Sequence, residues 1–209
     1  MMKRLLFSVF VCLASAISTL AQTNAPANKQ TRAAEIARTK AYCQELDDYA
    51  KRNPKLGRIF ADVSSDGESQ KSPWREFESD AEREKADTGD NLNENAVVWS
   101  KDGAVVLASC TFQSPSRDWA HFVSYYFRAD GTLAKVRARL NTFYGEMTVI
   151  RERFYDSKGR LLSSSQQFLD LKTQKKKKPG AEFQDDSFPL YRTVRALPFY
   201  AMLGKQAGK

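Results

Sequence analysis

The sequence reads WSKDGAV at residues 99–105, FRADGTL at 127–133 and YDSKGRL at 155–161, and these three stretches decide the fold. Their glycines follow one another at intervals of 28 residues. Each glycine fits the fourth position of a type I turn, where it adopts a positive φ and forms a bulge. The repeat therefore predicts three β-hairpins, each with an aromatic residue opposite an aliphatic one beside the turn. The predicted pairs are Trp99 with Val105, Phe127 with Leu133, and Tyr155 with Leu161.

This register also sorts the side chains of the middle hairpin between the two faces of the sheet. One face gathers the residues suited to pack under a helix, namely Ala120, Phe122, Ser124, Tyr126, Ala134, Val136, Ala138 and Leu140. The other face gathers aromatic and cationic residues, namely Trp119, His121, Val123, Tyr125, Phe127, Leu133, Lys135, Arg137 and Arg139. A tight turn at Tyr144-Gly145 places Arg137 opposite Glu152 in the following strand.

One long helix is predicted before the hairpins, from Thr31 to Lys51. Thr31 suits the N-cap, the next residues are rich in alanine, and Asn53-Pro54 ends the helix. The stripe that packs lies at helical spacing and consists of Ile36, Cys43, Leu46 and Ala50.

Together these elements predict an α+β fold, in which the N-terminal helix packs on an antiparallel β-meander of about six to eight strands. We expect the hairpin array at residues 96–171, a short strand within 57–63, and a short surface helix or ordered loop over 73–87. A short helix near residues 190–196 should precede a C-terminal end that docks on the body. The sheet is expected to be curved, and at the limit to form a half-barrel.

The first residues predict export. A basic start is followed by an apolar run, residues 5–20, that is too short to span a bilayer comfortably. We expect residues 1–21 to be a secretory signal peptide, 22–30 a flexible leader and 31–209 a single domain that is periplasmic or secreted. An uncleaved N-terminal anchor is the alternative. No later segment is long and apolar enough to cross a membrane.

Two cysteines, Cys43 and Cys110, remain after signal cleavage. An even count in an oxidising compartment permits one disulfide between them. Two separate buried thiols are an equally good interpretation, because free cysteine packs as a small apolar residue.

The charge is positive overall and unevenly distributed. The chain carries a net charge of +8, yet residues 62–94 contain eleven acidic and four basic side chains. A basic surface suits an anionic ligand, a glycan or another component of the cell envelope, whereas export argues against nucleic acid. The run Lys175–Lys178 is interpreted as a solvated loop, with contact to an anionic membrane or polyanion as the alternative.

The sequence contains no coherent catalytic set. His121 is the only histidine, which removes a multi-histidine zinc site, and the acidic pairs lack the alternation of a calcium loop. Neither a phosphate-binding glycine loop nor a nucleophile elbow is present, and Ser163, Ser164 and Ser165 are typical of a polar strand. We therefore assign no catalytic residue and expect no metal and no cofactor.

The residues best suited to hold a ligand are the aromatic and cationic ones of the second predicted face: Trp119, His121, Tyr125, Lys135, Arg137 and Arg139. A solvated sheet face with pairs such as Arg137–Glu152 is the alternative interpretation. The first functional hypothesis is an exported, non-catalytic binding or interaction domain. The other hypotheses are an envelope carrier of lipids or amphiphiles with a half-barrel cavity, and a hydrolase that uses His121.

Overall fold

The computed structural model describes residues 25–63, 74–87, 92–181, 183 and 187–204. The signal peptide predicted for residues 1–21 lies outside this part of the chain. No helix within it has both the length and the apolar content needed to cross a membrane.

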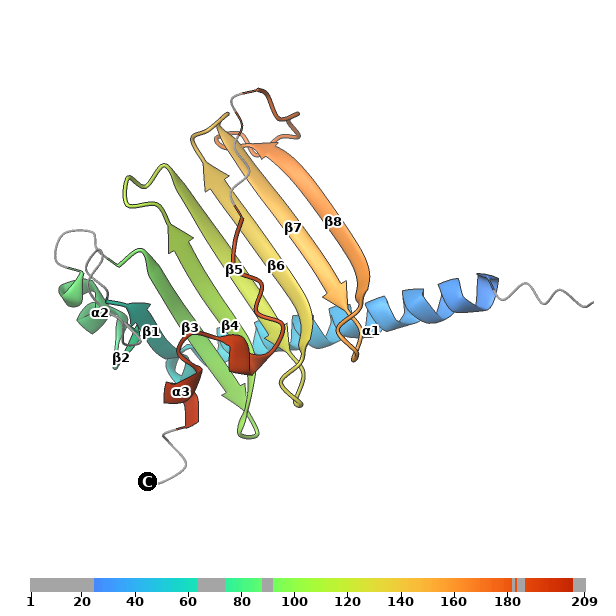
Figure 1. Cartoon of the computed structure of the whole chain (residues 1–209), viewed down its shortest axis with the longest axis horizontal. Helices are drawn as coiled ribbons and strands as arrows, with labels where there is room; N and C mark the ends of the chain where they lie inside the picture. Colours follow the sequence, from blue (N-terminus) through green and yellow to red (C-terminus); the bar gives the residue numbers. More distant parts are fainter. Residues whose placement is uncertain (1–24, 64–73, 88–91, 182, 184–186, 205–209) are drawn as a thin grey trace, which may run out of the picture.

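A single eight-stranded antiparallel sheet forms the body of the protein (Figure 1). The strands lie in the order β2-β1-β3-β4-β5-β6-β7-β8, so the sheet is open, with β2 and β8 at its edges. Their bounds are β1 (Arg58–Asp62), β2 (Trp74–Phe77), β3 (Glu94–Lys101), β4 (Ala104–Gln113), β5 (Trp119–Phe127), β6 (Leu133–Thr142), β7 (Met147–Tyr155) and β8 (Leu161–Asp170). The predicted α+β fold with a curved antiparallel meander is thereby confirmed.

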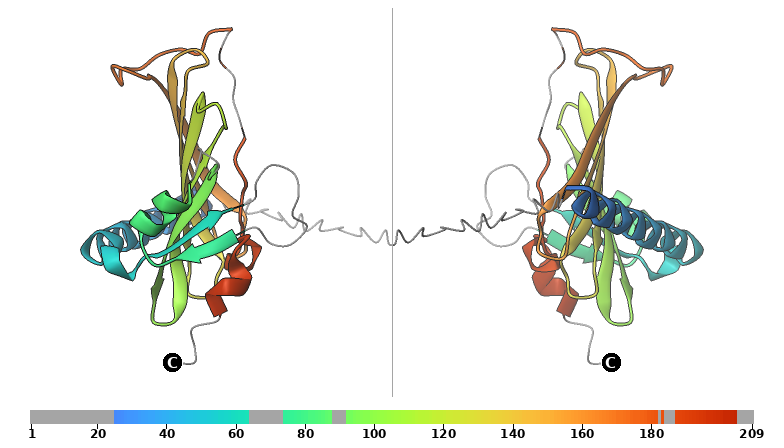
Figure 2. Two further views of the ribbon diagram at one scale, coloured as in Figure 1. Left: turned by 90° about the vertical axis from the view of Figure 1, so that its left-hand side faces the viewer. Right: turned by 90° about the vertical axis from the view of Figure 1, so that its right-hand side faces the viewer.

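The long helix α1 (Ala25–Arg52) crosses one face of the sheet, and the C-terminal segment covers the other (Figure 2). α1 begins at Ala25, within the segment 22–30 that the sequence predicted as a flexible leader. The remaining helices are short: η1 (Pro54–Leu56), α2 (Asp80–Ala86), η2 (Val194–Ala196) and α3 (Tyr200–Leu203). The helix expected near 190–196 is thus a single 3-10 turn, and β2 occupies part of the segment expected as a helix or loop.

The second and third hairpins have the predicted turns. Gly131 (φ 80°) and Gly159 (φ 74°) lie in the left-handed region, and Phe127 pairs with Leu133. Tyr155 likewise pairs with Leu161. The first hairpin differs, because Lys101 already pairs with Ala104 across a two-residue turn. The expected pair of Trp99 with Val105 is therefore wrong, and Trp99 pairs with Leu107.

Every one of these hairpins also contains a β-bulge close to its turn. The register shifts between Trp99 and Ser100, between Tyr126 and Phe127, and between Phe154 and Tyr155. The extra residue in each case stands three positions after the turn glycine, at Val106, Ala134 and Leu162. The 28-residue repeat of the sequence is therefore a repeat of turn and bulge together.

The bulge at Ala134 overturns the predicted faces of the middle hairpin. Tyr126 pairs with Lys135 and Ser124 pairs with Arg137, one residue away from the uninterrupted register. A shift of one residue moves every later side chain of β6 to the other face relative to β5. Lys135, Arg137 and Arg139 therefore lie on the face that α1 crosses, and Val136 packs with Tyr125 on the opposite face. The predicted pairing of Arg137 with Glu152 is confirmed.

Helix α1 packs along the row of bulges. Leu46 and its neighbours Cys43 and Ala50 form a buried cluster with Val106, Leu107 and Tyr126. At the other end of the row, the Arg32 side chain donates from Nε to the Leu162 carbonyl oxygen over 2.6 Å. On the opposite face, Phe199 stacks on Phe60 with 4.7 Å between ring centroids. The sheet is therefore the middle of three layers.

Candidate functional site

The six residues predicted to hold a ligand do not share one surface. Trp119, His121 and Tyr125 lie under the C-terminal segment, whereas Lys135, Arg137 and Arg139 lie on the α1 face. The His121 side chain is fully buried, with ring centroids 5.6 Å from Trp119 and 5.5 Å from Phe188. Such an imidazole is not accessible to a substrate that approaches from solvent.

The cationic residues of the α1 face are largely engaged within the protein. Lys135 Nζ lies 2.7 Å from Glu152 Oε1 and 5.1 Å from the centroid of the Phe154 ring. Arg139 donates to the side-chain oxygens of Asn141 and Gln174, each over 3.1 Å. These contacts support the sheet and the loop after β8. Arg137 and Arg139 are both exposed, and Lys135 is half-buried.

The two cysteines are free thiols in the structure. Cys43 packs between α1 and the sheet, while Cys110 belongs to the cluster on the opposite face, so the sheet itself separates the two sulfurs. Burial raises the pKa of Cys43 to about 12 and also raises that of Cys110. Of the two interpretations, the structure favours two separate, buried and protonated thiols.

Within the described ranges, no three or more His, Cys, Asp or Glu side chains lie close enough together to hold a metal ion. The candidate site lies at the open edge of the sheet formed by β8.

The backbone of β8 alternates between bonds to β7 and groups that point away from the sheet. The Phe168 carbonyl accepts from the Lys177 N–H over 3.1 Å, and the Leu162 carbonyl accepts from Arg32, so both residues face outward. Since outward residues alternate along a strand, Ser164 and Gln166 also direct their N–H and C=O groups outward. No protein group in the described ranges bonds to these four atoms.

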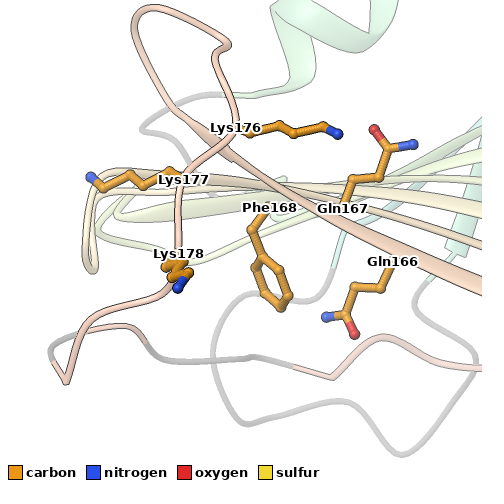
Figure 3. A pocket seen from close by; sticks show the side chains of 6 residues that line it. All are labelled: Gln166, Gln167, Phe168, Lys176, Lys177 and Lys178. Carbon is orange, nitrogen blue, oxygen red and sulfur yellow. The ribbon is translucent and has the colours of Figure 1, made fainter.

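A groove of about 570 Å³ runs along this edge, between β8 and the segment that returns beside it (Figure 3). Its lining consists of Gln166, Gln167, Phe168, Lys176, Lys177 and Lys178. The Phe168 ring makes an edge contact with Phe183, with 5.8 Å between centroids, which gives the groove an aromatic floor. The groove therefore combines free backbone groups, a ring and cations.

The lysines of the groove differ in what they contact. Lys177 Nζ donates to the Gly145 carbonyl over 2.8 Å and lies 3.5 Å from Asp170 Oδ2. Lys176 and Lys178 are exposed, and neither forms an ion pair with any residue that the structure describes. Hydrogen bonds from the backbone and side chain of Thr173 hold the pKa of Asp170 below its usual value. This carboxylate is thus committed to its own turn, and two cations remain available.

The components of this site can be recognised in the sequence, but their assembly into one site cannot. Residues 163–165 were expected as a polar strand, which is confirmed, and residues 175–178 as a solvated loop. In the structure the segment Lys175–Lys177 pairs briefly with the end of β8, where the Asp170 N–H donates to the Lys175 carbonyl over 2.8 Å. The sequence feature that could have indicated this site is the uncharged polar run 163–167, which is followed closely by four lysines.

Comparison of the chain with models of protein families, with curated proteins and with solved structures finds no match.

Proposed function

We propose that this protein is an exported, non-catalytic interaction domain that binds an extended segment of a partner at the β8 edge. Strand addition of this kind draws its affinity from backbone hydrogen bonds to an open sheet edge. The observation that carries the proposal is the pair of outward residues Ser164 and Gln166, whose backbone groups lack partners in the described part of the chain.

The two edges of the sheet differ in a way that supports a role for β8. Exposed edges are usually shortened, charged or covered, because they otherwise pair with other chains. The edge strand β2 is only four residues long, whereas β8 has ten residues and carries no charge from Leu161 to Leu169. β8 thus keeps an uncharged open stretch at residues 163–167, between the bonds to Arg32 and Lys177, that could accept a short strand.

Helix α1 provides a floor for such a strand. It meets β8 at Arg32 and continues beyond the sheet edge to Ala25 (Figure 1). These seven residues extend about 10 Å at a rise of 1.5 Å each, which equals the width of about two strands. An added strand would therefore lie beside β8 and over α1.

The two alternative functions receive less support. The space between α1 and the sheet is occupied by the cluster around Leu46 and Tyr126, where an amphiphile carrier would need a cavity. A hydrolase that uses His121 would need that buried ring to reach its substrate.

Selection of peptides from a phage-displayed random library tests the proposal, with the purified mature protein as the target. Enriched peptides should bind Ser164→Pro about 2- to 10-fold more weakly, because proline removes one outward N–H and hinders the incoming strand. Ser164→Ala is the matched control and should bind like the wild type, since its backbone is unchanged. Equal binding by Ser164→Pro would refute strand addition at this edge.

A further inference from the structure

We infer that the partner segment that binds at β8 is acidic, an inference that rests on the strand-addition site proposed above. The segment would lie between Leu162, whose carbonyl accepts from Arg32, and Phe168, whose carbonyl accepts from Lys177. It would pair along residues 163–167, a distance of about 14 Å at 3.4 Å per residue. It would therefore be about five residues long, with its carboxylates placed toward both ends.

Cations stand at both ends of the open edge. Lys176 and Lys178 lie at the Phe168 end, exposed and without ion pairs to described residues. Arg32 lies at the Leu162 end, where Nε and Nη2 donate to the backbone and Nη1 makes no hydrogen bond to the described residues. Carboxylates near the two ends of the incoming segment would meet these groups.

The middle of the open edge also carries more positive than negative unpaired charge. β8 itself has no charged side chain before Asp170, and Arg153 of β7 lies opposite Ser164. Asp170 is engaged by Lys177 and by its own turn, so it does not offset the free lysines. Glu152, opposite Ser165, is paired with Lys135 over 2.7 Å. An acidic segment would thus meet cations at both ends of the edge and Arg153 near its middle, whereas a basic segment would be repelled.

Pairing of β8 with β8 of a second copy is disfavoured by the same charges. An antiparallel pair centred on Ser165 would bring the Phe168 end of one copy to the Leu162 end of the other. Lys176 and Lys178 of one molecule would then approach Arg32 of the second, and like charges oppose such contacts. The charge pattern therefore favours a different, acidic protein segment.

The library selection described above also tests this inference when the charge of the enriched peptides is recorded. We expect the wild type to enrich peptides rich in Asp and Glu, and Lys176→Glu/Lys178→Glu to bind them about 2- to 30-fold more weakly at low salt, as two exposed ion pairs predict. The matched control is Lys55→Glu/Lys101→Glu, which changes the same total charge at exposed positions away from β8. It should bind as the wild type does.

The remaining outcomes separate the two claims. Enrichment of neutral or basic peptides that are sensitive to Ser164→Pro would leave strand addition intact and overturn the acidic preference. Acidic peptides that bind Ser164→Pro and wild type equally would overturn both, because the lysines would then act as a general polyanion surface. Failure to enrich any peptide sensitive to Ser164→Pro would also overturn both. Self-association that Ser164→Pro abolishes, measured by sedimentation velocity, would identify a second copy as the occupant and refute the inference.

Discussion

Replacement by proline should strongly reduce the stability of the protein at one of two neighbouring serines of β8 and hardly change it at the other. Ser164 and Ser165 are both exposed, but the Ser164 N–H points outward while Ser165 pairs with Glu152 of β7. Proline at 165 removes a ladder bond of about 0.5–1.5 kcal/mol and leaves a carbonyl unpaired at about 1–3 kcal/mol. We therefore expect Ser165→Pro to lower the free energy of unfolding by about 2–4 kcal/mol. Ser164→Pro removes no ladder bond and should stay within about 1 kcal/mol of the wild type.

Urea denaturation followed by tryptophan fluorescence measures both variants, since the chain contains three tryptophans. With a urea dependence of about 2 kcal/mol per molar, the two midpoints should differ by about 1–2 M. Alanine at each position is the control, because it keeps the N–H and should leave both midpoints close to that of the wild type. Equal destabilisation by the two prolines would show that the outward assignment of Ser164 is wrong, and the proposed site would lose its basis.

Other predictions concern the turns, the thiols and the loop after β8. Gly159→Ala should cost about 1–2 kcal/mol in thermal unfolding, because its φ is 74° and no neighbouring atom hinders a Cβ; Gly204→Ala, at φ −81°, should cost nothing comparable. Cys43 and Cys110 should resist iodoacetamide in the native protein at pH 8 and react in urea, since burial raises both pKa values; rapid native labelling would contradict this burial. The depressed pKa of Asp170 contributes stability that is complete above its ordinary pKa of about 3.9 and is lost as pH falls through the folded value. A carboxyl NMR titration should therefore find Asp170 below 3.9, and a midpoint at or above it would refute the bonding described.

Turn chemistry made much of the fold predictable. Gly131 and Gly159 require positive φ, and this requirement placed Phe127 opposite Leu133 and Tyr155 opposite Leu161. The same reasoning failed at Gly103, because Asp102 also takes a positive φ of 51° and shortens the turn. Aspartate is one of the few residues that adopt this conformation readily, so either turn was compatible with the sequence there.

The faces of the sheet were predicted incorrectly because a bulge changes which residues pair without changing composition. Its trace in the sequence is a pair of consecutive apolar residues after each turn, such as Leu133-Ala134, both of which are buried. A strand of strict alternation would expose one of the two. A bulge inferred from this break in alternation would place Arg137 and Arg139 on the α1 face, away from His121.

The candidate site depended on information that local sequence does not contain. Polar composition predicted a strand at residues 163–165, but whether a strand lies at an edge is decided by the order of all eight. The outward direction of Ser164 is set by the register of β8 against β7 and follows from the bonds that Leu162 and Phe168 make to Arg32 and Lys177. The lysine run is evident in the sequence, but its position beside the open edge is evident only in the structure.

The spacing of contacts along α1 matches the spacing of the hairpins, and the helix extends past the sheet at β8. Neighbouring hairpins lie about 9.6 Å apart, which is two strand spacings, and seven helical residues advance about 10.5 Å. From Arg32, which bonds at Leu162, to Leu46, which packs at Val106, α1 advances by two heptads while its contacts move by two hairpins. α1 begins one further heptad before Arg32, at Ala25. Its first two turns therefore lie beyond the last hairpin, beside the strand whose edge is open.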